Sequence, residues 1–218
     1  MSSAIEIVTS YDERDSLKKK LCEAHPLDRR HDRQHDDRLL DVLTEACAFA
    51  WAAQVARLGR PHFCFQPGAP DLQLDPEGWV EAKAVHPSEE DQRLSKRMLE
   101  ERLVVSGQPM AARQGLYEKV RADFNKAGAQ LAGRDGPRIV FFNLTALDLP
   151  QRAVEEVEEA ELDSVATLIQ ALVRKEPDVD AAAFCHGYLW EKARLLGHAP
   201  GSPAHWADAE KPPLSALS

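Results

Sequence analysis

The sequence lacks the features that mark several common protein classes. No apolar run approaches the roughly 18 residues of a transmembrane helix, so we expect a chain that does not span a membrane. No charged segment followed by an apolar stretch opens the chain, which predicts no signal peptide and a cytoplasmic location. No internal repeat, helix-turn-helix or zinc module is evident that would supply a recognition surface.

Cysteine is scarce and scattered. The 218 residues include four cysteines without any Cys-x-x-Cys spacing, at Cys22, Cys47, Cys64 and Cys185. The last three lie in apolar surroundings, so we expect reduced thiols in the core rather than disulfides or a zinc site.

Positive charge is also in short supply. The formal net charge of −9 argues against a nucleic-acid enzyme, because phosphates are usually neutralised by a basic surface. The distribution weakens this objection. Residues 93–138 hold ten Lys and Arg against five Asp and Glu, whereas residues 139–218 hold six against thirteen. A basic middle beside an acidic C-terminal part can still present a positive cleft.

The chain has enough apolar content for one core, at 44% hydrophobic residues. Apolar periodicity and turn residues predict a domain over residues 36–190 in the order helix, three strands, helical insert, strand, helix, strand. The strand–helix–strand step at the end implies a parallel pair. The first strand is expected at residues 62–65, and the strand after the insert at residues 138–144. The insert covers about 88–133 and begins with a helix at about 88–102. We expect residues 1–35 to be a polar arm or loosely attached helix, and residues 191–218 to be a tail.

The stretch from Pro70-Asp71 to Glu81-Ala82-Lys83 is the most informative. Period-2 alternation on both sides of residues 75–78 predicts two half-buried strands joined by a turn. A type I turn closed by a glycine bulge would pair Asp75 with Trp79, Gln73 with Glu81, and Asp71 with Lys83. Asp71, Gln73, Glu81 and Lys83 would then share one face, whereas a two- or four-residue loop would move Asp71 to the other.

Two carboxylates and an ammonium group on one face suit a divalent cation and a water beside a phosphodiester. A second Pro-Asp pair, Pro177-Asp178, has no Asp/Glu-x-Lys partner and serves as an internal comparison. The alternative for the hairpin is a cross-strand ion pair on a solvated sheet face.

These residues resemble the signature of the PD-(D/E)xK nuclease superfamily. The resemblance implies an α/β fold with a restriction-endonuclease-like αβββαβ core, in which helices flank a central mixed sheet. It also implies a Mg²⁺ cofactor, with Mn²⁺ as a substitute. Asp71 and Glu81 would be the metal-binding carboxylates, the backbone carbonyl of Ala82 a further ligand, and Lys83 the group that orients and helps activate the attacking water.

Members of this superfamily often carry another acid on the helix before the hairpin. Glu45 is the best match for a further metal ligand, with Asp41 one helical turn earlier as a substitute. Glu45 lies beside the apolar stripe of its helix, so it either reaches the hairpin or faces water.

The helix after the hairpin offers Lys119, Lys126 and Gln130 as nucleic-acid contacts. Lys126 and Gln130 are four residues apart and share a helix face. The resemblance implies contacts to phosphate or to the nucleophilic water, and an ordinary exposed face is the alternative. Position 134 is Arg, which does not support the exonuclease-like branch, where a Tyr follows the Gln by four residues.

The function we expect is that of a metal-dependent nuclease, foremost a DNA endonuclease. Double-strand cleavage would call for two active sites and thus for a homodimer. One alternative is a non-catalytic nucleic-acid- or protein-binding module on the same fold. The other is an acidic interaction or regulatory protein with a purely structural hairpin.

Overall fold

The computed structural model describes residues 3–24, 33–54, 59–86, 110–144, 155–186 and 190–197. A six-stranded sheet forms its centre, with the strand order β1-β2-β3-β4-β5-β6. The strands are β1 (Arg60–Phe63), β2 (Leu72–Asp75), β3 (Trp79–Ala84), β4 (Arg138–Leu144), β5 (Ala181–His186) and β6 (Arg194–Leu196). The strands β3, β4 and β5 run parallel, and the other neighbours are antiparallel.

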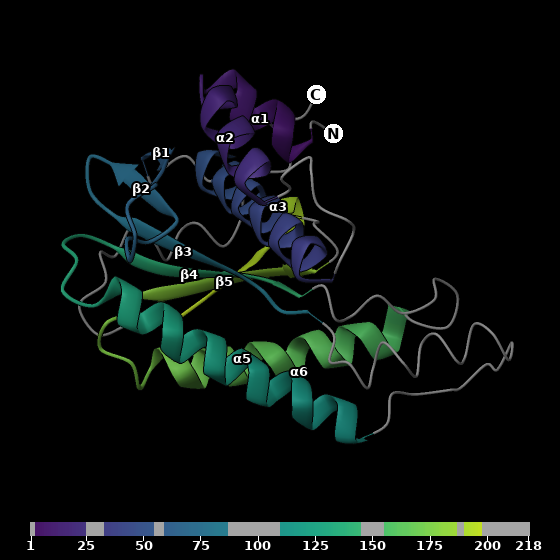
Figure 1. Ribbon diagram of the computed structural model, residues 1–218. Coiled ribbons are helices and arrows are strands. Elements are labelled where there is room, and N and C mark those ends of the chain that lie inside the picture. The colour runs from purple at the N-terminus through teal and green to yellow at the C-terminus, as the bar shows by residue number, and fades with distance from the viewer. Residues whose placement is uncertain are drawn as a thin grey trace, which may run out of the picture.

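Helices cover both faces of this mixed sheet (Figure 1). They are α1 (Ala4–Ser10), α2 (Arg14–Ala24), α3 (Arg33–Gln54), α5 (Met110–Leu131), α6 (Glu155–Val173) and the short 3-10 helix η2 (Trp190–Lys192). In Figure 1, α1, α2 and α3 lie on one face, and α5 and α6 lie on the other. The expectation of an α/β fold with a central mixed sheet flanked by helices is confirmed.

Each face of the sheet has its own apolar core. On one face, Phe49 and Trp51 of α3 pack with Leu72, Leu74 and the alternate residues of β3 and β4. The other face packs α5 and α6 against the remaining side chains of β4 and β5. Since β4 and β5 are covered on both sides, they are almost continuously apolar, as central parallel strands usually are.

Most of the predicted elements are present. β4 has the predicted bounds, and its parallel pairing with β5 is confirmed. β1 covers residues 60–63 instead of 62–65 and includes Pro61, which an edge strand tolerates because one side of its backbone has no partner. The helix expected at about 88–102 lies outside the described residues.

Both flanking segments differ from the prediction. The described part of residues 1–35 includes α1 and α2, whose Val8 and Leu17 are buried in the core beside α3. Within the predicted tail, residues 194–196 form β6, which pairs with β5. Isolated apolar residues anchor both segments, so they gave no periodic signal in the sequence.

No helix in the described parts of the chain is long and apolar enough to cross a membrane. Cys47 and Cys185 are buried, as predicted, whereas Cys64 is only half-buried. Burial raises the pKa of Cys47 to about 12, so its thiol stays protonated at neutral pH.

Candidate active site

The hairpin of β2 and β3 has a different register from the predicted one. Leu72 pairs with Val80 and Gln73 pairs with Trp79, which moves the pairing by two residues. The Leu74 N–H donates to the carbonyl of Gly78 at 2.8 Å. Gly78 therefore belongs to the ladder instead of forming the bulge, and the predicted pairing is wrong. Because side chains alternate with a period of two, this offset leaves every side chain on its predicted face.

Asp71 lies directly before β2, where regular pairing with β3 stops. Its backbone N–H donates to Oε2 of Glu81 at 3.2 Å, and its Oδ2 accepts the N–H of Ala82 at 2.9 Å. The carboxylate of Asp71 thus takes the place of a backbone partner for β3. The N–H and C=O of one strand residue point to the same side, so the carbonyl of Ala82 also faces Asp71.

Lys83 connects the strand to α5. Its Nζ makes a close ion pair with Oε1 of Glu81 and donates to Oε1 of Gln130 at 3.0 Å. Glu81 is only 1% exposed, which is rare for a glutamate and requires partners of this kind. The structure therefore brings four predicted site residues together in one cluster, which consists of Asp71, Glu81, Lys83 and Gln130.

Glu45 reaches the hairpin side of α3 and does not face water. Its side chain is 13% exposed, and its Oε2 lies 2.5 Å from Nζ of Lys20 on α2. Asp41, the substitute, is 53% exposed and pairs with Nε2 of His86 at 3.1 Å. Glu45 is therefore the acid of this helix that joins the cluster.

Burial, together with the charge of neighbouring carboxylates, raises the pKa of each acid in the cluster. Burial and the charge of Asp71 raise the pKa of Glu45 to about 8 and that of Glu81 to about 7. Burial also raises the pKa of Asp71 above its ordinary value, against the Ala82 amide and the two lysines. Buried carboxylates held in one another's field favour a bound cation and are typical of functional sites.

Lys83 carries a positive charge at neutral pH. Burial acts to lower its pKa, but the combined attraction of Glu81, Asp71 and Asp123 raises it above the ordinary value. Asp123 is an acid on α5 that the sequence did not single out, since one more acid on a polar helix face carries no distinctive signal.

The two predicted lysine contacts on α5 lie apart from the cluster. Lys119 donates to the backbone carbonyl of His86 at 2.9 Å, just after β3. Lys126 is 71% exposed and lies 3.4 Å from Asp123. Of the three predicted contacts on α5, Gln130 is the one that bonds to Lys83.

The second Pro-Asp pair has a structural role. Asp178 accepts a 3.0 Å hydrogen bond from Nη1 of Arg138, and Asp180 accepts bonds from the backbone N–H and Nε of the same arginine. These contacts join the start of β4 to the loop before β5. A Pro-Asp pair alone therefore does not mark a site in this chain.

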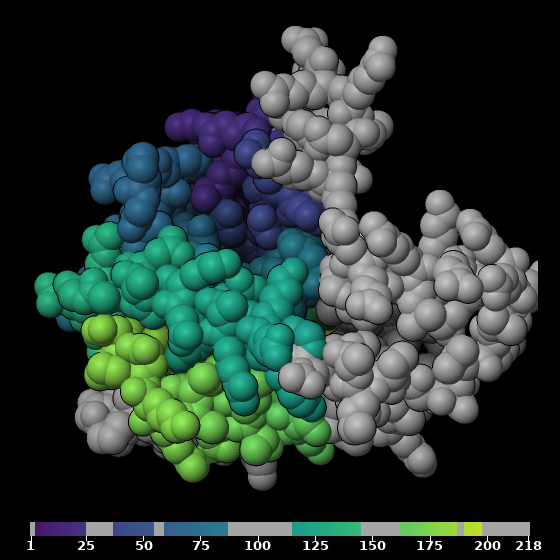
Figure 2. Space-filling view, turned by 60° about the horizontal axis from the view of Figure 1, so that its bottom comes forward, coloured from purple at the N-terminus to yellow at the C-terminus, as the bar shows by residue number. Residues whose placement is uncertain are grey.

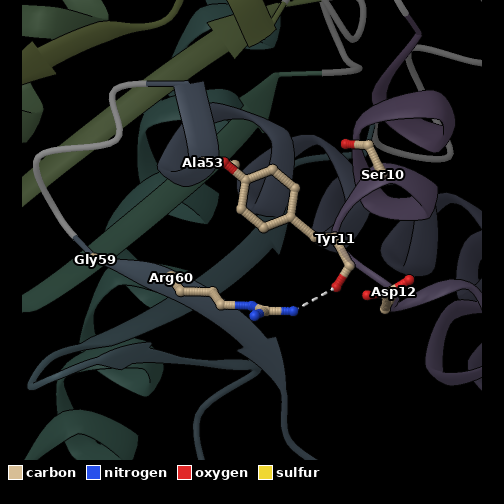
Figure 3. Close-up of a pocket in the computed structure, with 6 residues that line it drawn as sticks. All are labelled: Ser10, Tyr11, Asp12, Ala53, Gly59 and Arg60. Atoms are coloured by element: carbon tan, nitrogen blue, oxygen red, sulfur yellow. Dashed lines mark hydrogen bonds between the residues drawn. The ribbon is translucent and has the colours of Figure 1, made fainter.

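Figure 2 shows a depression between α5 and the N-terminal helices. Gln130 belongs to α5, and Lys20 belongs to α2. A separate pocket of about 530 Å³ lies where α1 and α3 end and β1 begins (Figure 3). Arg60 there donates to the carbonyl of Tyr11 at 2.9 Å, and no residue of the cluster lines this pocket.

The donor atoms that converge on β3 are all oxygens. No three His, Cys, Asp or Glu side chains within the described ranges are grouped so as to hold a metal ion on their own. The set that fits a cation combines the carboxylates of Asp71 and Glu81 with the carbonyl of Ala82. Oxygen donors of this kind suit Mg²⁺, which keeps several of its waters when bound to protein.

No protein-family model, curated protein or solved structure matches this chain.

Proposed function

We propose that this chain is a Mg²⁺-dependent nuclease with a PD-(D/E)xK, restriction-endonuclease-like core, which hydrolyses phosphodiester bonds in DNA. One observation carries the proposal. Asp71 and Glu81 are held together at the edge of β3 by the amide of Ala82 and the backbone N–H of Asp71, with Lys83 beside them. The element order of α3 to β5 is consistent with that core.

A purely structural ion pair accounts poorly for this arrangement. Lys83 needs one carboxylate as a partner, whereas Asp71 adds a second one that raises the pKa of Glu81. Burying two like charges in one another's field destabilises the folded chain unless a cation compensates them. The surplus negative charge therefore supports a cation site rather than a structural contact.

Each residue of the site has a distinct task in this proposal. Asp71, Glu81 and the carbonyl of Ala82 would hold the metal. When bound, Mg²⁺ lowers the pKa of a coordinated water and stabilises charge that develops on the phosphate. Lys83 stays protonated, so it acts as a hydrogen-bond donor that orients the attacking water and stabilises the transition state, not as a base. Gln130 fixes the position of its ammonium group.

The test is cleavage of linear, supercoiled and branched DNA with Mg²⁺ or Mn²⁺. Wild type is compared with Asp71→Ala and Lys83→Ala, and Asp178→Ala serves as the control from the structural Pro-Asp pair. We expect metal-dependent cutting by wild type and Asp178→Ala, and its loss in the other two variants. A wild type that binds no metal in calorimetry and cuts no DNA would contradict the proposal. DNA binding without metal binding and without cleavage would favour a non-catalytic binding module.

A further inference from the structure

Lys20 brings a positive charge from α2 to the candidate site. Its Nζ lies 2.5 Å from Oε2 of Glu45, and the two side chains are 12% and 13% exposed. The same ammonium group lies 5.6 Å from the ring centroid of Phe63 and 5.4 Å from that of Phe65. An ion pair and two aromatic faces therefore fix the ammonium group in place.

Its neighbour Lys19 is different. Lys19 is exposed, and its Nζ lies 4.3 Å from the ring centroid of Phe65. Within the described residues, Lys19 forms no ion pair with a carboxylate. The two lysines are therefore adjacent in sequence, but Lys20 pairs with an acid of the cluster, whereas Lys19 lies at the surface.

The charge of Lys20 acts beyond Glu45. Burial raises the pKa of Glu45 and of Asp71, and the attraction of Lys20 partly offsets that rise for both acids. Lys20 thus approaches the cluster from the side of α2 and α3, whereas Lys83 approaches from β3 and α5. Glu45 pairs with the first of these ammonium groups, and Glu81 pairs with the second.

The charges of the cluster determine how many divalent ions it can take. The three carboxylates of Glu45, Asp71 and Glu81 and the two ammonium groups of Lys20 and Lys83 leave one net negative charge when all are ionised. One divalent ion and one bridging phosphodiester bring the sum to zero. A second divalent ion would leave two uncompensated positive charges in a half-buried site, which is unfavourable.

Two neighbouring acids act on the cluster from outside it. Asp41 raises the pKa of Asp71, and Asp123 raises that of Lys83. Asp123 lies 3.4 Å from Lys126, and Asp41 is exposed and lies 3.1 Å from His86. The net charge of one negative unit is that of the five ionised side chains of the cluster itself.

We propose that Lys20 supplies the second positive charge of the site, so that the chain uses one divalent ion, and that Glu45 holds Lys20 in place of a second ion. This inference rests on the proposed nuclease function. In two-metal nucleases the second ion stabilises the leaving oxygen. An ammonium group can stabilise the same charge as a compact point charge with three hydrogen-bond donors.

The number of bound ions tests this inference directly. Calorimetric titration with Mn²⁺ alone is carried out on wild type, Lys20→Met, Lys20→Arg and Lys19→Met. We expect one ion per chain for wild type, Lys20→Arg and Lys19→Met. Lys20→Met frees Glu45 and removes the competing charge, so it should bind two ions. Two ions in wild type, or an unchanged single ion in Lys20→Met, would overturn the inference.

Cleavage of a DNA substrate supplies a second readout. At a Mn²⁺ concentration that fills one site, Lys20→Met should cut about 10²-fold more slowly than wild type, a typical loss for one electrostatic contact. Lys20→Arg should recover most of the rate, and Lys19→Met should cut at the wild-type rate. A rate in Lys20→Met equal to that of wild type would overturn the inference.

A paired variant covers the case in which Lys20→Met does not fold. Lys20→Met with Glu45→Gln removes both charges, so no buried carboxylate is left without a partner. We expect this variant to fold, bind one Mn²⁺ and cut about 10²-fold more slowly than wild type. Cutting at the wild-type rate would contradict the inference. A wild type that binds two ions and still cuts defeats this inference alone, whereas one that neither binds Mn²⁺ nor cuts defeats the proposed function with it.

Discussion

The backbone N–H of Ala82 donates a 2.9 Å hydrogen bond to the carboxylate of Asp71. Through this bond a side chain replaces the strand partner that β3 loses where β2 begins. The backbone carbonyl of Asp71 also accepts the N–H of Cys64 at 2.9 Å, which ties the loop between β1 and β2 to the same point. Asp71 therefore combines a structural contact with the charge that a metal site needs, and substitutions can separate the two.

Asp71→Asn should keep the structural contact and lose the metal. An amide oxygen can still accept the Ala82 N–H, and burial disfavours the charge that the substitution removes. We expect Asp71→Asn to be at least as stable as wild type, whereas Asp71→Ala loses about 1–3 kcal/mol by leaving a half-buried donor unpaired. Both should bind Mn²⁺ at least about tenfold more weakly. Urea unfolding and calorimetry measure the two effects, and equal destabilisation by Asn and Ala would contradict the structural role.

Gln130 and Lys126 form a matched pair on α5. Gln130 accepts a hydrogen bond from Lys83, whereas Lys126 is solvent-exposed. We expect Gln130→Ala to lower kcat about tenfold or more through a misplaced Lys83, with little change in DNA affinity. Lys126→Ala should leave kcat unchanged. Single-turnover cleavage and fluorescence anisotropy separate rate from binding, and an equal loss of kcat in both variants would refute the positioning role of Gln130.

The sequence contained enough information to place the carboxylates on one face. Alternation in β2 and β3 determines the face of each side chain, and it is unaffected by the two-residue offset in pairing. The pairing itself depends on Gly78 entering the ladder, where its neighbour Trp79 donates to the carbonyl of Pro137 at 2.7 Å. Such a long-range contact leaves no periodic signal in the hairpin, so the register could not be derived from it.

The position of Lys20 in the site could not be predicted from the sequence either. It belongs to a run of three lysines that indicates only local positive charge. Its contact with Glu45 depends on how α2 packs on α3, which is determined by isolated buried residues such as Leu17. Sequence reasoning found the acids because their spacing reports on a hairpin, and it missed the cation because its partner lies on another helix.

Arg138 provides a test of stability that is independent of the site. Its guanidinium and backbone N–H make contacts to Asp178, Asp180 and the carbonyl of Pro177. Arg138→Ala should lower the free energy of unfolding by about 2–3 kcal/mol, because two partly buried carboxylates lose a charged donor. Arg194→Ala, which removes a more exposed ion pair with Asp163, should cost at most about 1 kcal/mol.

Urea unfolding of the Arg138 and Arg194 variants measures both values. Metal binding by Arg138→Ala, assayed where the variant is folded, should match that of wild type, since Arg138 lies outside the carboxylate cluster. Equal costs for the two substitutions would show that the Arg138 contacts contribute no more than a surface ion pair.

The raised pKa values of Glu45 and Glu81 predict how stability depends on pH and on metal. In the unfolded chain both glutamates release their protons near the ordinary pKa of 4.5, whereas in the folded chain they hold them until about pH 8 and 7. Between about pH 5 and 8 the folded state therefore binds more protons than the unfolded state. The contribution of these groups to stability consequently falls as pH rises.

A divalent cation should reverse this trend, because it binds the deprotonated carboxylates of the folded chain. We expect Mg²⁺ or Mn²⁺ to raise the thermal midpoint more at pH 8 than at pH 5.5. Glu81→Gln should reduce both the fall with pH and the response to metal. Glu77→Gln, which changes an exposed glutamate of the turn by the same atoms, is the control. Differential scanning calorimetry at the two pH values measures the thermal midpoint with and without metal. If metal raised the midpoint equally at both, the protons and the cation would not compete for the same carboxylates, and the cluster would not be the metal site.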